Sequence, residues 1–144
     1  MNQPKIKLSS ETLQYLMLFE KFTGARALDC TEYNDELIFL VPKEDLIIVK
    51  VNPTKPLLKL SKILKKKILV YPYSEVAEEF IAGLFPKVKV LEVLLESQTD
   101  GRKVAFVKVD ESEKGKAIGL AGINVRRASF LARKYFSLDL VRVA

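Results

Sequence analysis

Hydrophobic and polar residues recur along the first half of this chain with two different periods. Apolar residues spaced three or four positions apart predict helices, and runs in which they fall at every second position predict strands. Gly24, Pro42 and Pro72 stand at the ends of such runs, where glycine and proline commonly end a helix or a strand. The predicted elements are a helix from Ser9 or Ser10 to Gly24, strands Ala27–Tyr33 and Glu36–Val41 joined at Asn34–Asp35, a short apolar segment Leu46–Val49, a helix from Lys55, and a strand Ile68–Tyr71.

The second half repeats the same order of patterns. Ser74 is placed to cap a helix whose first turn is acidic, and the sequence Thr99-Asp100-Gly101 is typical of the turn in a β-hairpin. The predicted elements are a helix Ser74–Phe85, strands Val88–Glu96 and Lys103–Val109, a short helix Glu113–Ile118, a helix Ile123–Tyr135 and a strand Leu138–Val143.

Each half therefore has the order helix-strand-strand-helix-helix-strand. An internal duplication of a small unit explains this repetition more simply than one larger fold does. We expect an α+β protein of two domains, residues 1–73 and 74–144, each with a three-stranded sheet covered by helices on one face. The boundary at Tyr73–Ser74 leaves almost no linker.

The stretch Gly115–Phe136 carries the most specific candidate chemistry. Its tetrad Gly119-Leu120-Ala121-Gly122 lies between two predicted helices, and a bend with two glycines lets another backbone approach closely. The helix that begins near Ile123 points its free N–H groups and the positive end of its dipole at that bend. Arg126 and Arg127 follow within one turn and add positive charge. This arrangement favours a phosphate group as the ligand.

The same residues also fit a structural corner between two helices, in which a glycine only ends the first helix. A Gly-x-x-Gly pair alone is a weak motif because it arises often by chance. The context favours the phosphate site, since Ile118 precedes the turn and Asn124 and two arginines follow it. In the following helix we expect a buried stripe of Ala128, Leu131, Ala132, Tyr135 and Phe136, with Arg126, Arg127, Arg133 and Lys134 largely outside it.

A second basic feature lies in the first half of the chain. Seven lysines and no acidic residue fall between Lys50 and Lys67. Most such runs are solvated helix faces, but the lack of compensating carboxylates favours a surface that faces RNA. In the predicted helix Leu57, Leu60, Ile63 and Leu64 share one face. The candidate basic stripe is Lys50, Lys55, Lys59, Lys62 and Lys66.

Composition narrows the classes of function. The net charge of +6 favours a polyanionic partner. The chain has no histidine and a single cysteine, Cys30, which excludes histidine-based catalytic triads and the usual zinc sites. No Gly-rich loop ends in Gly-Lys-Ser/Thr, and the carboxylates are scattered. We therefore expect no enzyme activity, no cofactor, no metal and no small-molecule substrate.

The same data predict the compartment. A single cysteine within an alternating apolar run fits a buried thiol in a reducing compartment. No apolar run approaches the length of a membrane span, and the N-terminus lacks the apolar core of a signal peptide. We expect a cytoplasmic protein with no membrane partner.

Two segments and the order of the elements resemble a known family. The segments are AIGLAGINVRRASFLARKYF in the second half and SSETLQYLMLFEKFTGARALDC near the start. They are similar to the archaeal NusA-like proteins, which consist of little more than two type II KH domains, and the similarity runs from about Lys7 to Val143. The resemblance implies a role in transcription elongation and termination, with nascent RNA and RNA polymerase as partners. In KH domains a GXXG loop clamps about four nucleotides of single-stranded RNA.

This chain departs from the family pattern in both loops. The middle residues of the second loop, which usually include a lysine or arginine, are Leu120 and Ala121. The first loop reads Val51-Asn52-Pro53-Thr54; it has no glycine, and Pro53 lacks an N–H, so we expect that clamp to be lost. The resemblance implies the following RNA-binding residues: Lys116, Ile118, Gly119, Leu120, Ala121, Gly122, Asn124, Arg126 and Arg127.

A protein-interaction adaptor is the alternative function. One or both domains would then dock on RNA polymerase or on a ribosomal protein. The degenerate first loop, with Leu57 and Leu58 behind it, suits a protein surface better than a phosphate. An accessory factor of RNA processing or ribosome maturation, with the same chemistry and another client, is a third reading.

Overall fold

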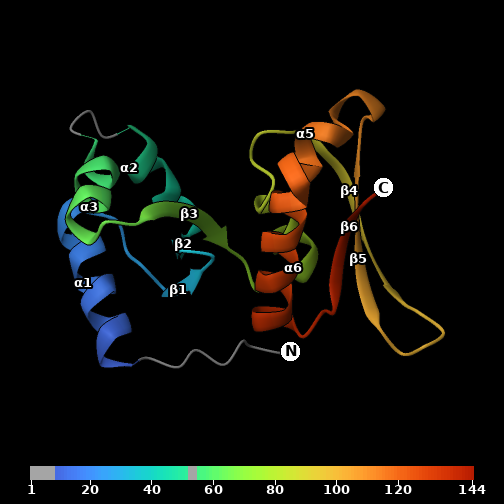
Figure 1. Ribbon diagram of the computed structural model, residues 1–144, viewed down its shortest axis with the longest axis horizontal. Helices are drawn as coiled ribbons and strands as arrows, with labels where there is room; N and C mark the ends of the chain where they lie inside the picture. Colours follow the sequence, from blue (N-terminus) through green and yellow to red (C-terminus); the bar gives the residue numbers. More distant parts are fainter. Residues whose placement is uncertain (1–8, 52–54) are drawn as a thin grey trace. The chain divides into compact units, whose positions relative to one another are not determined.

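The computed structural model describes residues 9–51 and 55–144 (Figure 1). These residues form two compact units, the first ending at Tyr73 and the second beginning at Ser74. Each unit has its own three-stranded sheet, and the order of helices and strands expected from the sequence is found in both.

The first unit is a mixed sheet with helices packed on one face. Its elements are α1 (Ser10–Thr23), β1 (Asp29–Tyr33), β2 (Glu36–Pro42), the 3₁₀ turn η1 (Lys43–Asp45), α2 (Leu46–Val51), α3 (Pro56–Leu64) and β3 (Lys67–Tyr73). The central strand β2 pairs antiparallel with β1 and parallel with β3.

The core of the first unit joins α1 and α3 to alternate residues of the sheet. Phe19 stacks on Phe39 with ring centroids 4.4 Å apart, and Leu60 is fully buried beside them. Cys30 is buried in the same core, as its place in the sequence pattern predicts. Successive strand residues point to opposite faces of a sheet, and paired residues point to the same face. Cys30 and Phe39 are such a pair, so this core lies on one face of the sheet.

The predicted ends of α1 are confirmed, whereas two predicted strand ends are wrong. Ser9 caps α1 by accepting a hydrogen bond from the N–H of Thr12, and Gly24 ends the helix in a left-handed conformation. Pro42 and Pro72 lie within β2 and β3 rather than beyond them. Proline is tolerated there because Pro42 is the last residue of its strand and Pro72 belongs to an edge strand.

The second unit repeats this arrangement. Its elements are α4 (Ala77–Gly83), β4 (Val90–Ser97), β5 (Lys103–Val109), η2 (Glu111–Glu113), α5 (Lys114–Ile118), η3 (Leu120–Gly122), α6 (Ile123–Phe136) and β6 (Leu140–Val143). The sheet order is β4-β5-β6, with β5 antiparallel to β4 and parallel to β6. Helices α4 and α6 lie on the same side of this sheet (Figure 1).

The predicted stripe of α6 is buried. Ala128, Leu131, Ala132 and Tyr135 are buried, and Phe136 is half-buried, with its ring centroid 5.1 Å from that of Phe80 on α4. The predicted start of α4 is wrong, because the helix begins after Val76. The Ser74 hydroxyl instead accepts a hydrogen bond from the N–H of Val76 and forms a local turn ahead of the helix.

Candidate nucleic-acid interface

The turn between α5 and α6 depends on the backbone conformation of Gly119. This residue ends α5, donates a hydrogen bond of 3.0 Å to the carbonyl of Gly115, and has φ 81° and ψ 167°. Only glycine occupies that region without strain. A Cβ atom added to Gly119 would also lie 2.8 Å from Nδ2 of Asn124. Conformation and space therefore both require a glycine at this position.

The second half of the turn leaves its backbone open. Ala121 and Gly122 are both left-handed, with φ 54° and 72°, and Gly122 donates a hydrogen bond of 3.0 Å to the carbonyl of Gly119. No atom lies within 4 Å of the place that a Cβ of Gly122 would take. Gly122 is also the N-cap of α6, and no side chain caps that helix end. A ligand can thus reach the backbone at the positive end of a helix of 14 residues.

Asn124 connects the two helices across the turn. Its Nδ2 donates to the carbonyl of Lys116 on α5 at 3.3 Å, and its Oδ1 accepts from Nη1 of Arg127 at 3.2 Å. These bonds fix how α5 enters the turn and how α6 leaves it. Asn124 therefore shapes the turn from within.

The prediction that Arg127 lies outside the buried stripe is wrong. Only 7% of the residue is exposed, and its guanidinium binds Asn124 instead of facing solvent. The sequence held a signal for this, because Arg127 stands four residues before Leu131 and thus on the same helical stripe. Arg127 is a positioning residue for the turn and supplies no surface charge.

Two other cations do face solvent beside the turn. Lys116 on α5 and Arg126 on α6 are exposed, and neither forms an ion pair within the described part of the chain. Ile118 and Leu120 add exposed apolar side chains, Leu120 with 90% of its surface accessible. The structure thus brings an open glycine backbone, two available cations and two apolar side chains to one turn.

The basic stripe of the first unit is only partly available. Lys50, Lys55, Lys59 and Lys62 are exposed, but Lys66 binds Oε2 of Glu32 at 3.0 Å and lies 3.8 Å from Asp35. The hydrogen bond to Glu32 raises the pKa of Lys66. The inference that this run lacks compensating carboxylates is therefore wrong for Lys66, because its partners lie more than 30 residues earlier in the sequence. Ile63, assigned to the apolar face, is exposed.

The described residues on either side of the corresponding loop of the first unit differ from those around the turn of the second. Asn52, Pro53 and Thr54 of that loop lie outside the described residues. On either side, Val51 at the end of α2 is 68% exposed, and Lys55 takes the left-handed conformation with φ 52° before Pro56 begins α3. At the N-terminus of α3 a lysine thus stands where α6 has Gly122.

An ion pair that no local sequence pattern predicts anchors the segment before α2. The Arg26 guanidinium donates to both carboxylate oxygens of Asp45, at 2.9 and 3.1 Å, and the Arg26 backbone N–H donates to the same carboxylate at 2.8 Å. These bonds hold the pKa of the Asp45 carboxyl below its ordinary value. The pair ties η1 to the chain that enters β1.

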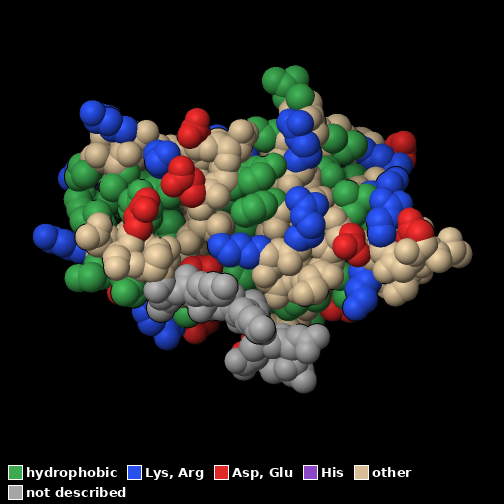
Figure 2. Space-filling model, turned by 60° about the horizontal axis from the view of Figure 1, so that its bottom comes forward, with side chains coloured by type: hydrophobic (Ala, Val, Ile, Leu, Met, Phe, Trp, Pro, Cys, Tyr) green, Lys and Arg blue, Asp and Glu red, His purple; other side chains and the backbone are tan. Residues whose placement is uncertain are grey.

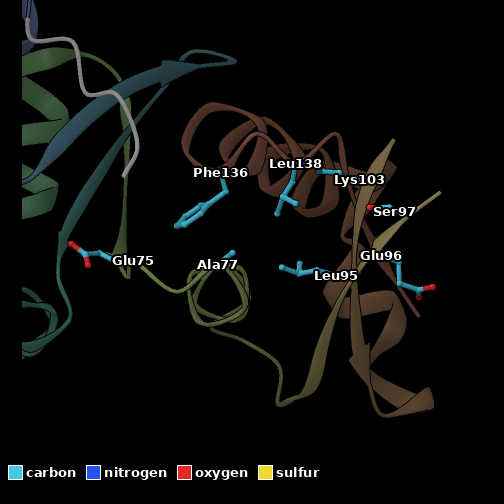
Figure 3. Close-up of a pocket in the computed structure, with 8 residues that line it drawn as sticks. All are labelled: Glu75, Ala77, Leu95, Glu96, Ser97, Lys103, Phe136 and Leu138. Carbon is cyan, nitrogen blue, oxygen red and sulfur yellow. The ribbon is translucent and has the colours of Figure 1, made fainter. Parts of the chain in front are cut away.

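Other features of the described residues lie apart from the turn. A cavity of about 320 Å³ opens beside the far end of α6, where Phe136 and Leu138 line it (Figure 3). Figure 2 shows Lys and Arg side chains lying among Asp and Glu side chains on the face it presents. Within residues 9–51 and 55–144, no cluster of metal-ligating side chains and no helix long and apolar enough to cross a membrane is found.

Comparison with known proteins finds relatives that match nearly the whole chain. The sequence model of the NusA-like second KH domain matches residues 77–141, which include the whole turn. A probable transcription termination protein NusA of Halococcus morrhuae is 28% identical over 97% of this chain and 99% of its own length. One of Thermoplasma acidophilum is 25% identical over 99% of both chains. Along nearly its whole length, the chain is similar to archaeal proteins of the NusA-like family.

A solved structure extends this result to three dimensions. The crystal structure of APE1850 superposes on the NusA-like chain with a TM-score of 0.84 and 33% identity, over 95% of this chain and 100% of the other. The fold described above is therefore shared along nearly the whole length. The match to the second KH domain places the glycine turn of this NusA-like protein inside its KH unit.

Proposed function

We propose that this NusA-like protein holds single-stranded RNA on the turn Gly119–Gly122 and thereby takes part in transcription elongation and termination. The observation that carries the proposal is the open glycine backbone at the N-terminus of α6, next to Lys116 and Arg126. The transcription role rests on relatives that are named probable transcription termination proteins. We infer a cytoplasmic, non-catalytic protein whose further partners belong to the transcription machinery.

The proposal includes the first unit as a second KH domain. Its order of helices and strands, and the pairing of its sheet, are the same as those of the second unit. We therefore read the chain as two tandem type II KH domains, residues 1–73 and 74–144. The clamp itself belongs to the second domain, because the first has a lysine at the helix entry where the second has Gly122.

In this mechanism the sugar-phosphate backbone lies against the main chain of the turn. The N-terminus of α6 attracts the phosphates, and Lys116 and Arg126 neutralise them. Ile118 and Leu120 provide apolar contacts for the bases. Because no residue from 114 to 126 is aromatic, stacking contributes little, and the preference for RNA sequence is weak.

RNA binding by the turn can be tested by introducing negative charge at its exposed residues. Gly119→Asp is unsuitable, because any side chain there meets Asn124. Leu120 and Ala121 are exposed, and aspartate tolerates the left-handed conformation of Ala121. We expect Leu120→Asp with Ala121→Asp to weaken binding of a labelled, mixed-sequence RNA octamer about tenfold or more in fluorescence anisotropy, through repulsion of phosphate.

The matched control replaces the same residues by their neutral counterparts. Leu120→Asn with Ala121→Asn has nearly the same shape without the charge, so its RNA affinity is expected within about threefold of wild type. Circular dichroism establishes that all three proteins are folded. Equal affinity of the aspartate pair and the wild type would remove the turn as the RNA site.

A second function is favoured by exposed apolar residues in the first unit. Ile47 and Val51 on α2 are 62% and 68% exposed, and Leu58 at the start of α3 is exposed as well. Such side chains suit a protein partner better than RNA. This adaptor function predicts that a polymerase or ribosomal component stays bound in a native extract after complete nuclease digestion. Ile47→Ser with Val51→Ser should release it, while RNA affinity remains unchanged.

A further inference from the structure

Strand β4 forms a free edge of the second sheet. It has eight residues and pairs only with β5, and no other described strand lies on its outer side. Leu91, Leu94 and Leu95 are exposed along it, Leu94 with 46% of its surface accessible. A long apolar edge strand is a template for pairing with another extended chain unless charges or a bulge protect it. In β4 the register shifts only near its start, between Val90 and Glu92.

The hydrogen-bond pattern identifies which backbone groups are free. Next to the hairpin turn, the N–H of Gln98 donates to the carbonyl of Arg102 at 2.7 Å. Bonded and non-bonded pairs alternate along an antiparallel ladder, so the N–H and C=O groups of Val93, Leu95 and Ser97 point away from β5. The bonds of Lys103, which lies opposite Ser97, support this assignment. Its N–H and C=O bind Asp139 on the side of β5 away from β4, so the pair Ser97–Lys103 is a non-bonded pair. No described residue bonds to the outward groups of β4.

The two faces of β4 differ in chemistry. Val93, Leu95 and Ser97 lie on the face that α4 and α6 cover, and there Leu95 points into the cavity of about 320 Å³ (Figure 3). Ala77, Phe136 and Leu138 complete the apolar wall of this cavity. On the opposite face Glu92 and Glu96 flank Leu94, and the Glu96 side chain points away from the cavity (Figure 3).

The charge of this side selects the partner. On β4 itself the two charged side chains are Glu92 and Glu96, and Lys108 of β5 lies opposite Glu92. Glu92 and Glu96 are exposed and form no ion pair among the described residues. If two copies of β4 paired through their outer edges, even-numbered residues of one copy would lie opposite even-numbered residues of the other. Glu92 and Glu96 of both copies would then lie on the same face of the paired strands, and their four carboxylates would repel one another. RNA would be repelled as well, so a basic polypeptide fits best.

We propose that the outer edge of β4 binds an extended segment of another protein in which lysine or arginine alternates with apolar residues. The backbone of that segment bonds to Val93, Leu95 and Ser97. Its basic side chains lie on the face of Glu92 and Glu96, and its apolar side chains lie on the face where the cavity opens. Main-chain bonds supply affinity and the side-chain positions supply specificity, as in other strand-addition complexes. The proposal is independent of RNA binding, since the turn lies at the opposite end of α6.

Model peptides test the charge pattern. We expect labelled acetyl-KVKVKVKV-amide to bind the full-length protein about tenfold or more tightly than acetyl-EVEVEVEV-amide in fluorescence anisotropy, through cross-strand charge pairs. Glu92→Lys with Glu96→Lys should reverse this order. Glu11→Lys with Glu44→Lys makes the same change of net charge at exposed sites of the first unit and should leave the order unchanged.

Amide exchange followed by NMR tests the backbone bonds without any substitution. With the lysine peptide bound, the amides of Val93, Leu95 and Ser97 should exchange more slowly, whereas those of Leu94 and Glu96 already bond to β5 and should not change. The proposal is overturned if the lysine peptide does not bind, or if the protein with Glu92→Lys and Glu96→Lys still prefers the lysine peptide to the glutamate peptide. It is also overturned if the peptide slows amide exchange equally at odd- and even-numbered residues of β4. A self-associated protein in sedimentation velocity, with the same alternating protection, would assign the edge to a second copy instead.

Discussion

The two units share one order of helices and strands but differ at the entry to the last helix. In the second unit the turn at this entry contains Gly119, Ala121 and Gly122, all with positive φ, and its backbone is open. In the first unit the helix entry carries Lys55 with a positive φ, and exposed Val51 ends the preceding helix. A shared fold therefore does not imply a shared site. The capacity to hold a phosphate depends on a few backbone conformations that only certain residues permit.

Each unit binds some of its cations to its own carboxylates, as Arg102 binds Asp100 in the second, and leaves others exposed, such as Lys59 in the first. In the first unit Lys66 and Arg26 are bound to carboxylates of the same unit. In the second, Lys116 and Arg126 remain available at the turn. Each half of the sequence holds 12 basic residues, and the first half holds 8 acidic residues against 10 in the second. Charge along the sequence therefore does not single out the turn of the second unit; the exposure of Lys116 and Arg126 does.

The largest effect is expected at Gly119. Gly119→Ala combines a strained backbone with a 2.8 Å contact, and it should lower the free energy of unfolding by about 2–4 kcal/mol. Gly122→Ala meets no atom and should cost only about 1–2 kcal/mol, for its left-handed conformation. Urea denaturation of the two variants measures the difference. Equal losses would contradict the distinct roles assigned to the two glycines.

The adjacent arginines should separate stability from binding. Arg127→Ala removes a buried side chain and leaves the half-buried oxygen of Asn124 without this donor, which should lower the free energy of unfolding by about 1–3 kcal/mol. Arg126→Ala should change it by less than about 0.5 kcal/mol. It should instead reduce the slope of log RNA affinity against log salt by about 0.7, the loss of one phosphate contact. Salt titration and urea denaturation of both proteins test this pair of outcomes.

A charge-reversal comparison tests the difference between the units directly. Lys116→Glu with Arg126→Glu should weaken binding of the RNA octamer about tenfold or more at 0.1 M salt, because two phosphate contacts are lost. Lys59→Glu with Lys62→Glu makes the same change of net charge on α3 and should weaken it by less than about threefold. A similar loss in both proteins would show that the first unit also binds RNA.

The smallest effect concerns the Arg26–Asp45 pair, present only in the first unit. Because Arg26 lowers the pKa of Asp45 in the folded state, the unfolded chain binds more protons near the ordinary carboxyl pKa of about 3.9. The stabilisation is complete above that pH and is lost as the pH falls through the lower, folded-state pKa. Asp45→Asn should reduce the slope of unfolding free energy against pH below about pH 4. The reduction corresponds to the uptake of at most about one proton on unfolding. Parallel curves for variant and wild type would contradict this linkage.

The sequence predicted the features that depend on the spacing of apolar residues. It did not predict contacts between residues that are far apart in the chain. Helix and strand order followed from the spacing of apolar residues, and the burial of Cys30 and Leu131 followed with it. The partners of Lys66 and Asp45 come from other elements, so no local pattern reveals them. The ends of elements were misplaced at Ser74 and Pro72, where a local turn and an edge position decide the outcome.

In the candidate site, too, the sequence did not reveal which contacts each residue makes. The two glycines of the turn were expected from the motif, but their different requirements for space follow only from the position of Asn124. Arg127 was expected at the surface because arginine is rarely buried. Its stripe on α6 and its bond to Asn124 account for its place inside.

The bridge that Asn124 makes between α5 and α6 has a consequence for the energetics of RNA capture. If the proposed RNA site is correct, the loop already has its shape before any nucleotide arrives, so little chain entropy would be lost when the strand docks and more of the contact energy would be retained as affinity. In the proposed mechanism, RNA affinity would therefore depend on the rigidity of a bend that one amide side chain maintains.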